Sequence, residues 1–476
     1  MLKKYKNMSI IAKASFWALL TGILQKGIGV LVTPIFTRIL STEEYAEYTL
    51  FQTWHDIFII FSTLNVFYYA TYNAMEKYKE DRDGFITSAQ SMVTLLSLGC
   101  MGIYVCVHMI FGEVIQFPLY IVVLMFMDMI FISAYYLWCA KCRYEYTYKA
   151  MTVVSILIGV SQPLLGILAI KYSPNRGYGR IFGVVLIDIL FGLIIYIYNL
   201  SKSKKLFVKE YWKYILVFCL PLIPHFLSSQ ILTRFDRIMI DDMCGKAQAG
   251  IYGLAYNLST LMVIINDAVL KVLTPWTYQQ ISSDKKGNIK GIINKLVPIV
   301  ALINIMLILF APEVVKIFAT KDYYEAIYII PPVSCSVFFM FVYNVYVNIE
   351  YYYEETKYVA VASITAAALN VILNFVFIKK FGYLAAGYTT LASYILYALA
   401  HYLFMKVVSK KHADGYGFFN NKIILIVSLI FVAISLAIIK LYNYAIIRYV
   451  IISVMVVVAI LFRKKIVRII KRDKGE

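Results

Sequence analysis

The segment "LLTGILQKGIGVLVTPIF", Leu19 to Phe36, is apolar over most of its length and is long enough to form the greater part of a membrane-spanning helix. It carries one charged residue, Lys26. An ammonium group inside a bilayer is costly unless it is solvated or paired. We therefore expect a membrane fold, in which Lys26 faces a polar cavity or a carboxylate rather than lipid.

Similar apolar segments recur along the whole chain. Of its 476 residues, 61% are hydrophobic and 15% are charged, which excludes an ordinary soluble globular protein. No stretch between the segments could build a separate water-soluble catalytic domain, so we do not expect an enzyme. The sequence predicts an all-α integral membrane protein with about fourteen transmembrane helices. The predicted spans are approximately 12–36, 47–73, 85–110, 115–139, 147–170, 179–200, 212–233, 250–279, 290–317, 324–350, 357–378, 382–406, 421–440 and 444–462.

Lysine and arginine are unevenly distributed between the two sides of the predicted membrane. They concentrate in "SKSKK" (Ser201 to Lys205), in "DKKGNIK" (Asp284 to Lys290) and in the final "RKKIVRIIKRDK" (Arg463 to Lys474). Because cytoplasmic segments carry the excess of positive charge, both termini are predicted to be cytoplasmic. This topology accounts for the net charge of +19 without a nucleic-acid partner.

The seven cysteines do not form a recognisable ligand or disulfide pattern. "CAKC", Cys139 to Cys142, has the spacing of a metal or redox pair but no second pair accompanies it. We expect packing residues, no metal site and no bound cofactor.

The chain also contains an internal repeat. "EEYAEYTLFQ" (Glu43 to Gln52) follows the first predicted span, and "AQAGIYGLAYN" (Ala247 to Asn257) follows the seventh. The repeat predicts two pseudo-symmetric six-helix lobes, related by an axis along the membrane normal, with two helices appended. The predicted divisions are 1–205 for spans one to six, 206–412 for spans seven to twelve, and 413–476 for the last two spans with a basic cytoplasmic tail.

Three longer blocks resemble a known family. They are "PIFTRILSTEEYAEYTLF" (Pro34 to Phe51), "LPLIPHFLSSQILTRFDRIMIDDMCGKAQAGIYGLAYNLS" (Leu220 to Ser259) and "ALNVILNFVFIKKFGYLAAGYTTLASYIL" (Ala368 to Leu396). The chain is similar, over nearly its whole length, to the Wzx-type polysaccharide repeat-unit flippases of the multidrug/oligosaccharidyl-lipid/polysaccharide export superfamily. That resemblance implies a MATE-like fold. It also implies translocation of an undecaprenyl-diphosphate-linked oligosaccharide from the cytoplasmic to the outer leaflet, by alternating access and without ATP, for O-antigen, capsule or exopolysaccharide synthesis.

The resemblance further implies a location and partners. The protein is expected to be a multi-pass protein of the bacterial cell (inner) membrane that contacts membrane lipids as well as the lipid-linked oligosaccharide. A polysaccharide polymerase and glycosyltransferases are candidate protein partners. A proton or a sodium ion is the candidate coupling ion, because an intramembrane carboxylate can bind either.

The candidate site residues follow from the chemistry of a diphosphate, which requires cations that face a cavity. Lys26 and Lys271 are the only basic residues that we place well inside predicted spans. At a rise of about 1.5 Å per residue, three carboxylates should lie near the depth of Lys26. They are Asp56, Asp128 and Asp188. Lys26 could exchange one of these carboxylates for the diphosphate, or it could form a fixed structural pair.

The second lobe offers fewer such residues. Asp267 and Lys271 stand four positions apart, which also permits a pair within one helix. Near the outer ends of spans, Arg38 and Arg234 could meet the diphosphate at the exit or could lock loops in a closed state. Both interpretations remain open from the sequence.

Two other functions compete with this one. A MATE-type proton- or sodium-coupled drug or metabolite antiporter would share the twelve-helix core and the ion coupling. A membrane glycosyltransferase is suggested by "DRD", Asp81 to Asp83, which has the form of a metal-nucleotide motif. It lies in a short cytoplasmic turn without a nucleotide-binding fold around it, and we do not expect it to bind a nucleotide.

Overall fold

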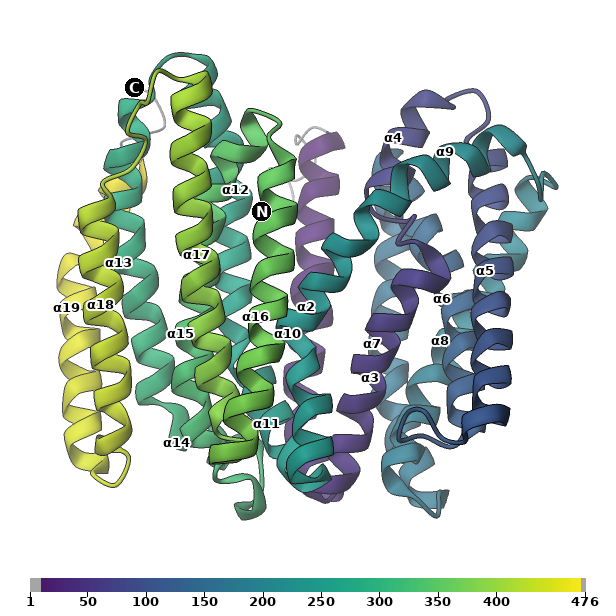
Figure 1. Cartoon of the computed structure of the whole chain (residues 1–476), viewed down its shortest axis with the longest axis horizontal. Coiled ribbons are helices and arrows are strands. Elements are labelled where there is room, and N and C mark those ends of the chain that lie inside the picture. Colours follow the sequence, from purple (N-terminus) through teal and green to yellow (C-terminus); the bar gives the residue numbers. More distant parts are fainter. Residues whose placement is uncertain (1–9, 472–476) are drawn as a thin grey trace, which may run out of the picture. The chain divides into compact units, whose positions relative to one another are not determined.

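The computed structural model describes residues 10–471, and it describes their side chains except at 10–16, 18–20, 22–26, 458–460 and 462–471. Within this range every regular element is a helix (Figure 1). The chain divides into two compact units, one up to Gly250 and the other from Ile251, which are described separately below. This division does not test the predicted lobe boundaries, which stay predictions.

The N-terminal unit is built from long helices joined by short turns. Its elements are α2 (Ile10–Ile39), α3 (Thr42–Thr63), α4 (Tyr69–Lys77), α5 (Arg82–Phe111), α6 (Leu119–Tyr144), α7 (Tyr148–Tyr172), α8 (Arg176–Lys202), α9 (Lys209–Cys219), η1 (Leu220–Leu222) and α10 (Ile223–Cys244). The division between the units falls inside α11 (Lys246–Ser259).

The C-terminal unit has the same character. Its elements are α12 (Leu261–Ser282), α13 (Gly287–Leu309), α14 (Ala311–Phe318), η2 (Lys321–Tyr323), α15 (Ala326–Tyr352), α16 (Thr356–Phe381), α17 (Ala385–His412), α18 (Asn421–Ile438), η3 (Ile439–Leu441) and α19 (Ala445–Lys471). Helix α15 is almost entirely enclosed by its neighbours, which makes it the centre of this unit.

Eleven helical segments of the described chain are long and apolar enough to cross a membrane, and they correspond to eleven of the predicted spans. The other three predicted spans are the first, the second and the last. Helices α2 and α19 contribute shorter apolar stretches, Gly27–Ile39 and Ala445–Val457, and α3 is not among the eleven. The all-α membrane fold is confirmed, and the predicted number of fourteen is approximate.

The predicted span 47–73 is wrong in one respect, because it is not one continuous helix. Helix α3 ends at Thr63, and Leu64 and Asn65 then adopt left-handed conformations with φ of 52° and 50°. The Thr63 hydroxyl accepts a hydrogen bond from the Asn65 amide at 3.1 Å, which satisfies a backbone donor at the break. Apolar windows alone do not detect a turn of this kind.

Two glycines bring α8 very close to the helices on either side of it. A Cβ atom on Gly183 would lie 2.3 Å from Gly166 Cα on α7. A Cβ atom on Gly192 would lie 2.4 Å from the carbonyl oxygen of Phe131 on α6. Because no side chain fits at either position, α6, α7 and α8 are packed backbone against backbone.

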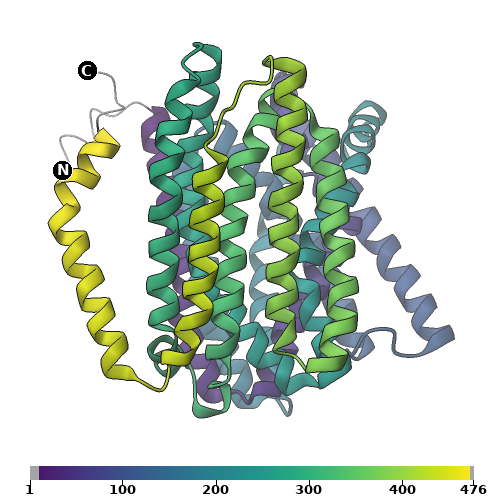
Figure 2. The ribbon, with the colours of Figure 1, turned by 60° about the vertical axis from the view of Figure 1, so that its left-hand side comes forward.

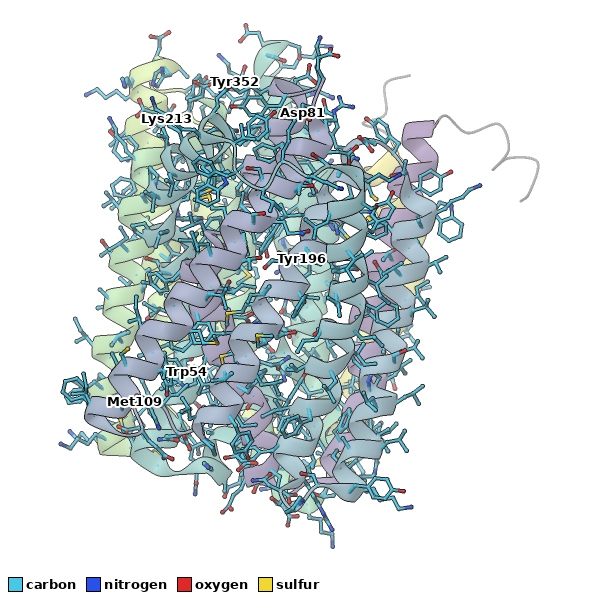
Figure 3. All side chains as sticks on the ribbon, turned by 90° about the vertical axis from the view of Figure 1, so that its right-hand side faces the viewer. Trp54, Asp81, Met109, Tyr196, Lys213 and Tyr352 are labelled. Atoms are coloured by element: carbon cyan, nitrogen blue, oxygen red, sulfur yellow. The ribbon has the colours of Figure 1, made fainter. Side chains whose placement is uncertain are left out.

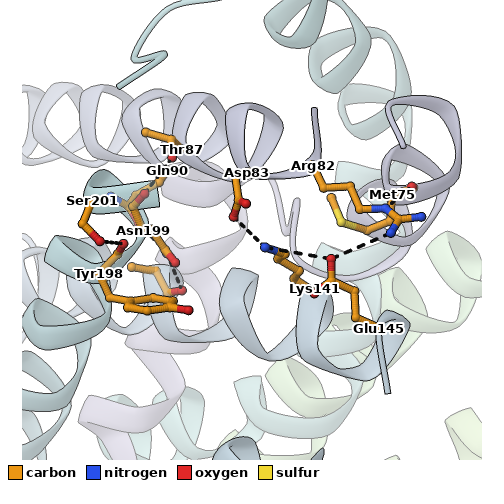
Figure 4. Close-up of polar contacts among 11 residues, drawn as sticks. Met75, Arg82, Asp83, Thr87, Gln90, Lys141, Glu145, Tyr198, Asn199 and Ser201 are labelled. Carbon is orange, nitrogen blue, oxygen red and sulfur yellow. Dashed lines mark hydrogen bonds and ion pairs between the residues drawn. The ribbon is translucent and has the colours of Figure 1, made fainter. Parts of the chain in front are cut away.

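A polar network joins the helix ends at one end of the N-terminal unit. Lys141 Nζ lies 2.5 Å from Asp83 Oδ1, and Arg82 donates a hydrogen bond to the carbonyl of Met75 (Figure 4). Asp81 pairs with Lys205 at 2.7 Å. The three residues of the "DRD" motif therefore make contacts between helix ends.

The labelled side chains show which residues share an end of this unit. Asp81 and Lys213 lie toward the end that carries the polar network, and Trp54 and Met109 lie toward the opposite end (Figure 3). This arrangement matches the order of the spans, since α5 begins beside Asp81 and ends beside Met109.

The last helix, α19, is joined to α14 of the same unit by an ion pair. Arg448 of α19 is almost fully buried, and its two terminal nitrogens lie 2.7 and 2.8 Å from the carboxylate oxygens of Glu313 on α14. Arg448 also donates to the Leu309 carbonyl at 2.8 Å. Helix α19 is held at this first turn and diverges from α18 beyond it (Figure 2).

Glu355, at the start of α16, is surrounded by basic side chains. It accepts a hydrogen bond from His412 Nε2 at 2.9 Å and another from Lys411, and Lys357 lies 3.4 Å away. The hydrogen bond from His412, followed by that from Lys411, lowers the pKa of Glu355 to about 2. These contacts tie the start of α16 to the end of α17.

We expect this cluster to contribute stability that depends on pH. The folded pKa of Glu355 is about 2 against an ordinary value of 4.5, so the contribution is complete above pH 4.5 and is lost as the pH falls toward 2. Glu355→Gln should lower the Tm of the purified protein at pH 7, and the difference from wild type should shrink as the pH falls toward 3. Glu354→Gln, one residue earlier, is the control that should leave the Tm unchanged. Equal Tm values for wild type and Glu355→Gln at pH 7 would contradict the assignment.

Candidate functional site

A polar cavity of about 330 Å³ lies inside the N-terminal unit, between α2, α3, α6, α7 and α8. One part of its wall is apolar and is formed by residues such as Ile28, Val32 and Ile158. The other part is polar and charged. Its polar lining residues include Tyr48, Tyr135, Tyr136, Arg143, Gln162, Arg180 and Asp188.

Arg180 is the cation that the fold buries in this cavity. The Asn175 side chain caps α8 by accepting a hydrogen bond from the Tyr178 amide, which starts the helix at Arg176 and places Arg180 one turn inside it. The side chain is 8% exposed. Its guanidinium lies over three aromatic rings, 3.7 Å from the Tyr48 centroid, 4.1 Å from Phe36 and 5.0 Å from Tyr45. The rings stabilise the charge without using its hydrogen-bond donors.

One of those donors is unused. Arg180 Nη1 is buried and has no hydrogen-bond partner among the described residues. A buried donor without a partner is unfavourable, and a ligand oxygen in the cavity would satisfy it. A planar guanidinium with an open donor is well suited to bind phosphate oxygens.

A chain of charges runs from α10 through α3 to α6. Arg234 Nε lies 2.7 Å from Asp56 Oδ2. On the other side, His55 Nδ1 lies 3.7 Å from Asp56 Oδ1, and His55 Nε2 lies 2.9 Å from Asp128 Oδ2. His55 therefore links Asp56 and Asp128, which the sequence predicts as two separate candidates.

The start of α3 is fixed by its own sequence. Ser41 accepts a hydrogen bond from the Glu44 amide at 3.1 Å, and the Glu44 carboxylate accepts one from the Ser41 amide at 2.8 Å. This capping box sets the first turn, and the helical period then orients His55 and Asp56 toward their partners.

Asp188 connects the charge chain to the cavity. It is 7% exposed, and it accepts a hydrogen bond from Gln162 Nε2 at 2.8 Å. It is also close enough to Asp128 and His55 to interact with them electrostatically. Asp188 and Arg180 stand eight residues apart on α8, and both line the cavity.

Of the other predicted residues, Arg38, Asp267 and Lys271 do not line this cavity. Lys26 lies on α2, but its side chain is outside the described residues. Arg38 is exposed and donates to the Pro34 carbonyl of its own helix at 2.9 Å. Asp267 and Lys271 belong to α12 of the C-terminal unit, where Lys271 is exposed and has no ion-pair partner in the described part of the chain.

Sequence reasoning missed Arg180 and His55. Arg180 stood at the edge of the predicted span 179–200, where it was indistinguishable from an interfacial arginine. His55 stood beside Asp56 and was not considered. The signal available for both was that each is a polar residue inside or at the edge of a predicted apolar span.

No group of three or more His, Cys, Asp or Glu side chains suited to a metal is found in the described residues. Cys139 and Cys142 are buried free thiols on α6. They pack in the interior of the N-terminal unit.

Comparison with known proteins identifies the family. The model of the family described as "Polysaccharide biosynthesis protein" matches residues 11–281, more than half of the chain. The chain belongs to this family. The predicted resemblance to Wzx-type flippases is thereby confirmed at the level of the family.

Two relatives of this polysaccharide biosynthesis family member come from Haemophilus influenzae. One, named "Uncharacterized membrane protein", is 22% identical over 389 residues, which are 76% of this chain and 89% of the relative. The other, "Lsg locus putative protein 1", is 25% identical over 252 residues, which are 49% of this chain and 59% of the relative.

Solved structures show the fold of this family member. The lipid II flippase MurJ in an inward closed conformation is similar with a TM-score of 0.67 at 18% identity, over 96% of this chain and all of MurJ. An inward-facing multidrug resistance MATE transporter has a TM-score of 0.64 at 15% identity, over 82% of this chain and 96% of the transporter. The predicted MATE-like fold of the export superfamily is confirmed. The two solved proteins named here are a flippase and a transporter.

Proposed function

We propose that this member of the polysaccharide biosynthesis family is a flippase for an undecaprenyl-diphosphate-linked oligosaccharide repeat unit. It would move the repeat unit from the cytoplasmic to the outer leaflet of the bacterial cell membrane for O-antigen, capsule or exopolysaccharide synthesis. The observation that carries the proposal is Arg180, a buried guanidinium with an unused donor in a polar cavity between membrane helices.

The proposed substrate matches the cavity in chemistry. The prenyl chain can stay in lipid, whereas the diphosphate and the sugars need a polar passage. Arg180 can donate to phosphate oxygens, and Arg143, which is exposed near the end of α6, adds a second cation to the same cavity. Tyr136, which also lines the cavity, offers its hydroxyl group to sugars.

Coupling to an ion gradient is part of the proposal. Asp128 of α6 lies 2.9 Å from His55 of α3, and Asp188 of α8 is within electrostatic range of both. Acidic groups in a membrane interior are suited to bind a proton or a sodium ion, and that binding would change the net charge of the cavity. Binding of the cation would favour binding of the anionic diphosphate, and release of the cation would disfavour it.

The remaining predicted site residues keep their proposed roles. Lys26, Arg38, Arg234 and Lys271 are proposed diphosphate contacts at different stages of transport, and Asp56 and Asp267 are proposed charge partners. The pair of Arg234 with Asp56 supports the structural alternative for Arg234, as a link between α10 and α3. A polymerase and glycosyltransferases remain the proposed protein partners, and both termini are proposed to be cytoplasmic.

Deletion of the gene in its native host tests the function. Lipid-linked repeat units should accumulate on the cytoplasmic face, and surface glycan should fall to the level of a strain without the first glycosyltransferase. Lipid extraction with leaflet-specific labelling, together with immunoblotting of surface glycan, measures both. Unchanged surface glycan with altered drug sensitivity would favour the MATE-type antiporter instead.

A further inference from the structure

An apolar groove lies on the surface of the C-terminal unit, between α16 and α17, which run side by side as a hairpin (Figure 1). Its volume of about 390 Å³ falls in the range of ligand-binding pockets, roughly 300–1,000 Å³. The residues that line it on α16 are Leu373, Phe377 and Phe381, and those on α17 include Leu384, Tyr388 and Ala392. The groove runs along both helices from the turn that joins them.

The floor of the groove is held by buried polar contacts. Asn370 donates to Thr390 at 3.4 Å, and Asn374 donates to Asn370 at 3.2 Å. Thr389, which lines the groove, donates to Asn374. These bonds fix α16 against α17, so the groove is part of the folded hairpin and does not need a ligand to form.

A cation stands at the end of the groove. Lys380 follows Phe377 by three residues and Leu373 by seven, which places it on the same face of α16. Its Nζ lies 5.3 Å from the ring centroid of Phe381, a residue that is 61% exposed and lines the groove. Lys380 has no ion-pair partner among the described residues.

The carboxylate that contacts the turn between α16 and α17 already has a hydrogen-bond partner. Glu325 at the start of α15 accepts a hydrogen bond from Tyr383, in the turn between α16 and α17. The neighbouring lysine, Lys379, lies about 100° around the helix from Lys380 and away from the line of Leu373 and Phe377. Lys380 is therefore on the face of α16 that carries the lining residues, next to Phe381, and Lys379 is not.

We propose that this groove binds an anionic phospholipid, with one acyl chain along α16 and α17 and the phosphate at Lys380. The groove is apolar and opens on a membrane-spanning hairpin, so a hydrocarbon chain is its natural occupant. A lysine at the end of a membrane helix reaches to the headgroup level, where a phosphate can balance its positive charge. In the predicted topology this is a lipid of the outer leaflet. The proposal does not depend on the transported substrate.

Native mass spectrometry of the purified full-length protein, delipidated and titrated with phosphatidylglycerol or phosphatidylcholine, tests it. Lys380→Gln should weaken phosphatidylglycerol binding about fivefold, the loss expected for one cation at a membrane surface, and should leave phosphatidylcholine binding unchanged. Lys379→Gln is the matched control and should change the binding of either lipid by less than about twofold. Ala392→Trp, which fills the groove, should reduce binding of both lipids.

Three results would overturn the proposal. Equal weakening by Lys380→Gln and Lys379→Gln would indicate a general surface charge effect. Unchanged phosphatidylglycerol binding by an Ala392→Trp protein of normal Tm would place the lipid elsewhere. Displacement of phosphatidylglycerol by an equal concentration of polyprenyl phosphate would assign the groove to a prenyl lipid.

Discussion

Replacement of Arg180 by glutamine should reduce export of the lipid-linked oligosaccharide by about ten- to a hundredfold. Hydrogen bonds to charged groups contribute about 1.5–3 kcal/mol each, and about 1.4 kcal/mol corresponds to a factor of ten. Glutamine keeps some polarity but loses the charge and the forked donors of arginine. The amount of surface glycan, relative to the amount of protein in the membrane, measures the effect.

Two further variants make the result specific. Arg180→Lys should keep part of the activity, because an ammonium is a cation but cannot stack on Tyr48 and Phe36 as a planar group does. Arg176→Gln, one turn earlier on α8 and exposed, removes the same charge outside the cavity and should have little effect. Full export by an Arg180→Gln protein that is present at normal levels would remove Arg180 from the proposed site.

Replacement of Asp188 by asparagine should abolish most of the response of transport to an ion gradient, a loss of about tenfold or more. The change removes one of the two interacting carboxylates but keeps a similar shape and can still bond to Gln162. A cation bound between Asp128 and Asp188 would then be balanced by one negative charge instead of two. Uptake of lipid-linked oligosaccharide into inverted membrane vesicles, with and without an imposed proton or sodium gradient, measures the response.

The comparison within this experiment separates coupling from folding. Transport without a gradient should persist in Asp188→Asn, whereas a variant that is merely unstable would lose both activities. Asp242→Asn, an exposed carboxylate near the end of α10, is the control. A normal gradient response in Asp188→Asn would assign Asp188 to a structural role.

The positions of most helices could be predicted from the sequence. The predicted spans 85–110 and 147–170 correspond to Arg82–Phe111 and Tyr148–Tyr172 within a few residues. Length and continuous apolarity decide these helices, because a bilayer-crossing segment must satisfy its own backbone hydrogen bonds. The turn at Leu64 and Asn65 was missed because it depends on two local backbone conformations and not on hydropathy.

The site could be predicted only in part. Depth along a helix follows from residue counting, which is why the sequence predicts Asp128 and Asp188 at similar depth, and in the structure they are within electrostatic range of each other. Rotation and partner choice depend on how the helices pack, so the link through His55 could not be derived. Arg234 was expected near the outer end of span 212–233. Helix α10 continues to Cys244, so Arg234 lies in the interior of α10, where it pairs with Asp56 of α3.

The close packing of α6, α7 and α8 limits how the cavity can open. With Gly183 against Gly166 and Gly192 against Phe131, these three helices are in close backbone contact and together form the wall that carries Arg180. Phe36 and Tyr48 belong to the opposite wall, on α2 and α3. If α2 and α3 moved away from this wall, the guanidinium would separate from its rings. Opening of the cavity in that direction would expose the positive charge of Arg180 to a ligand.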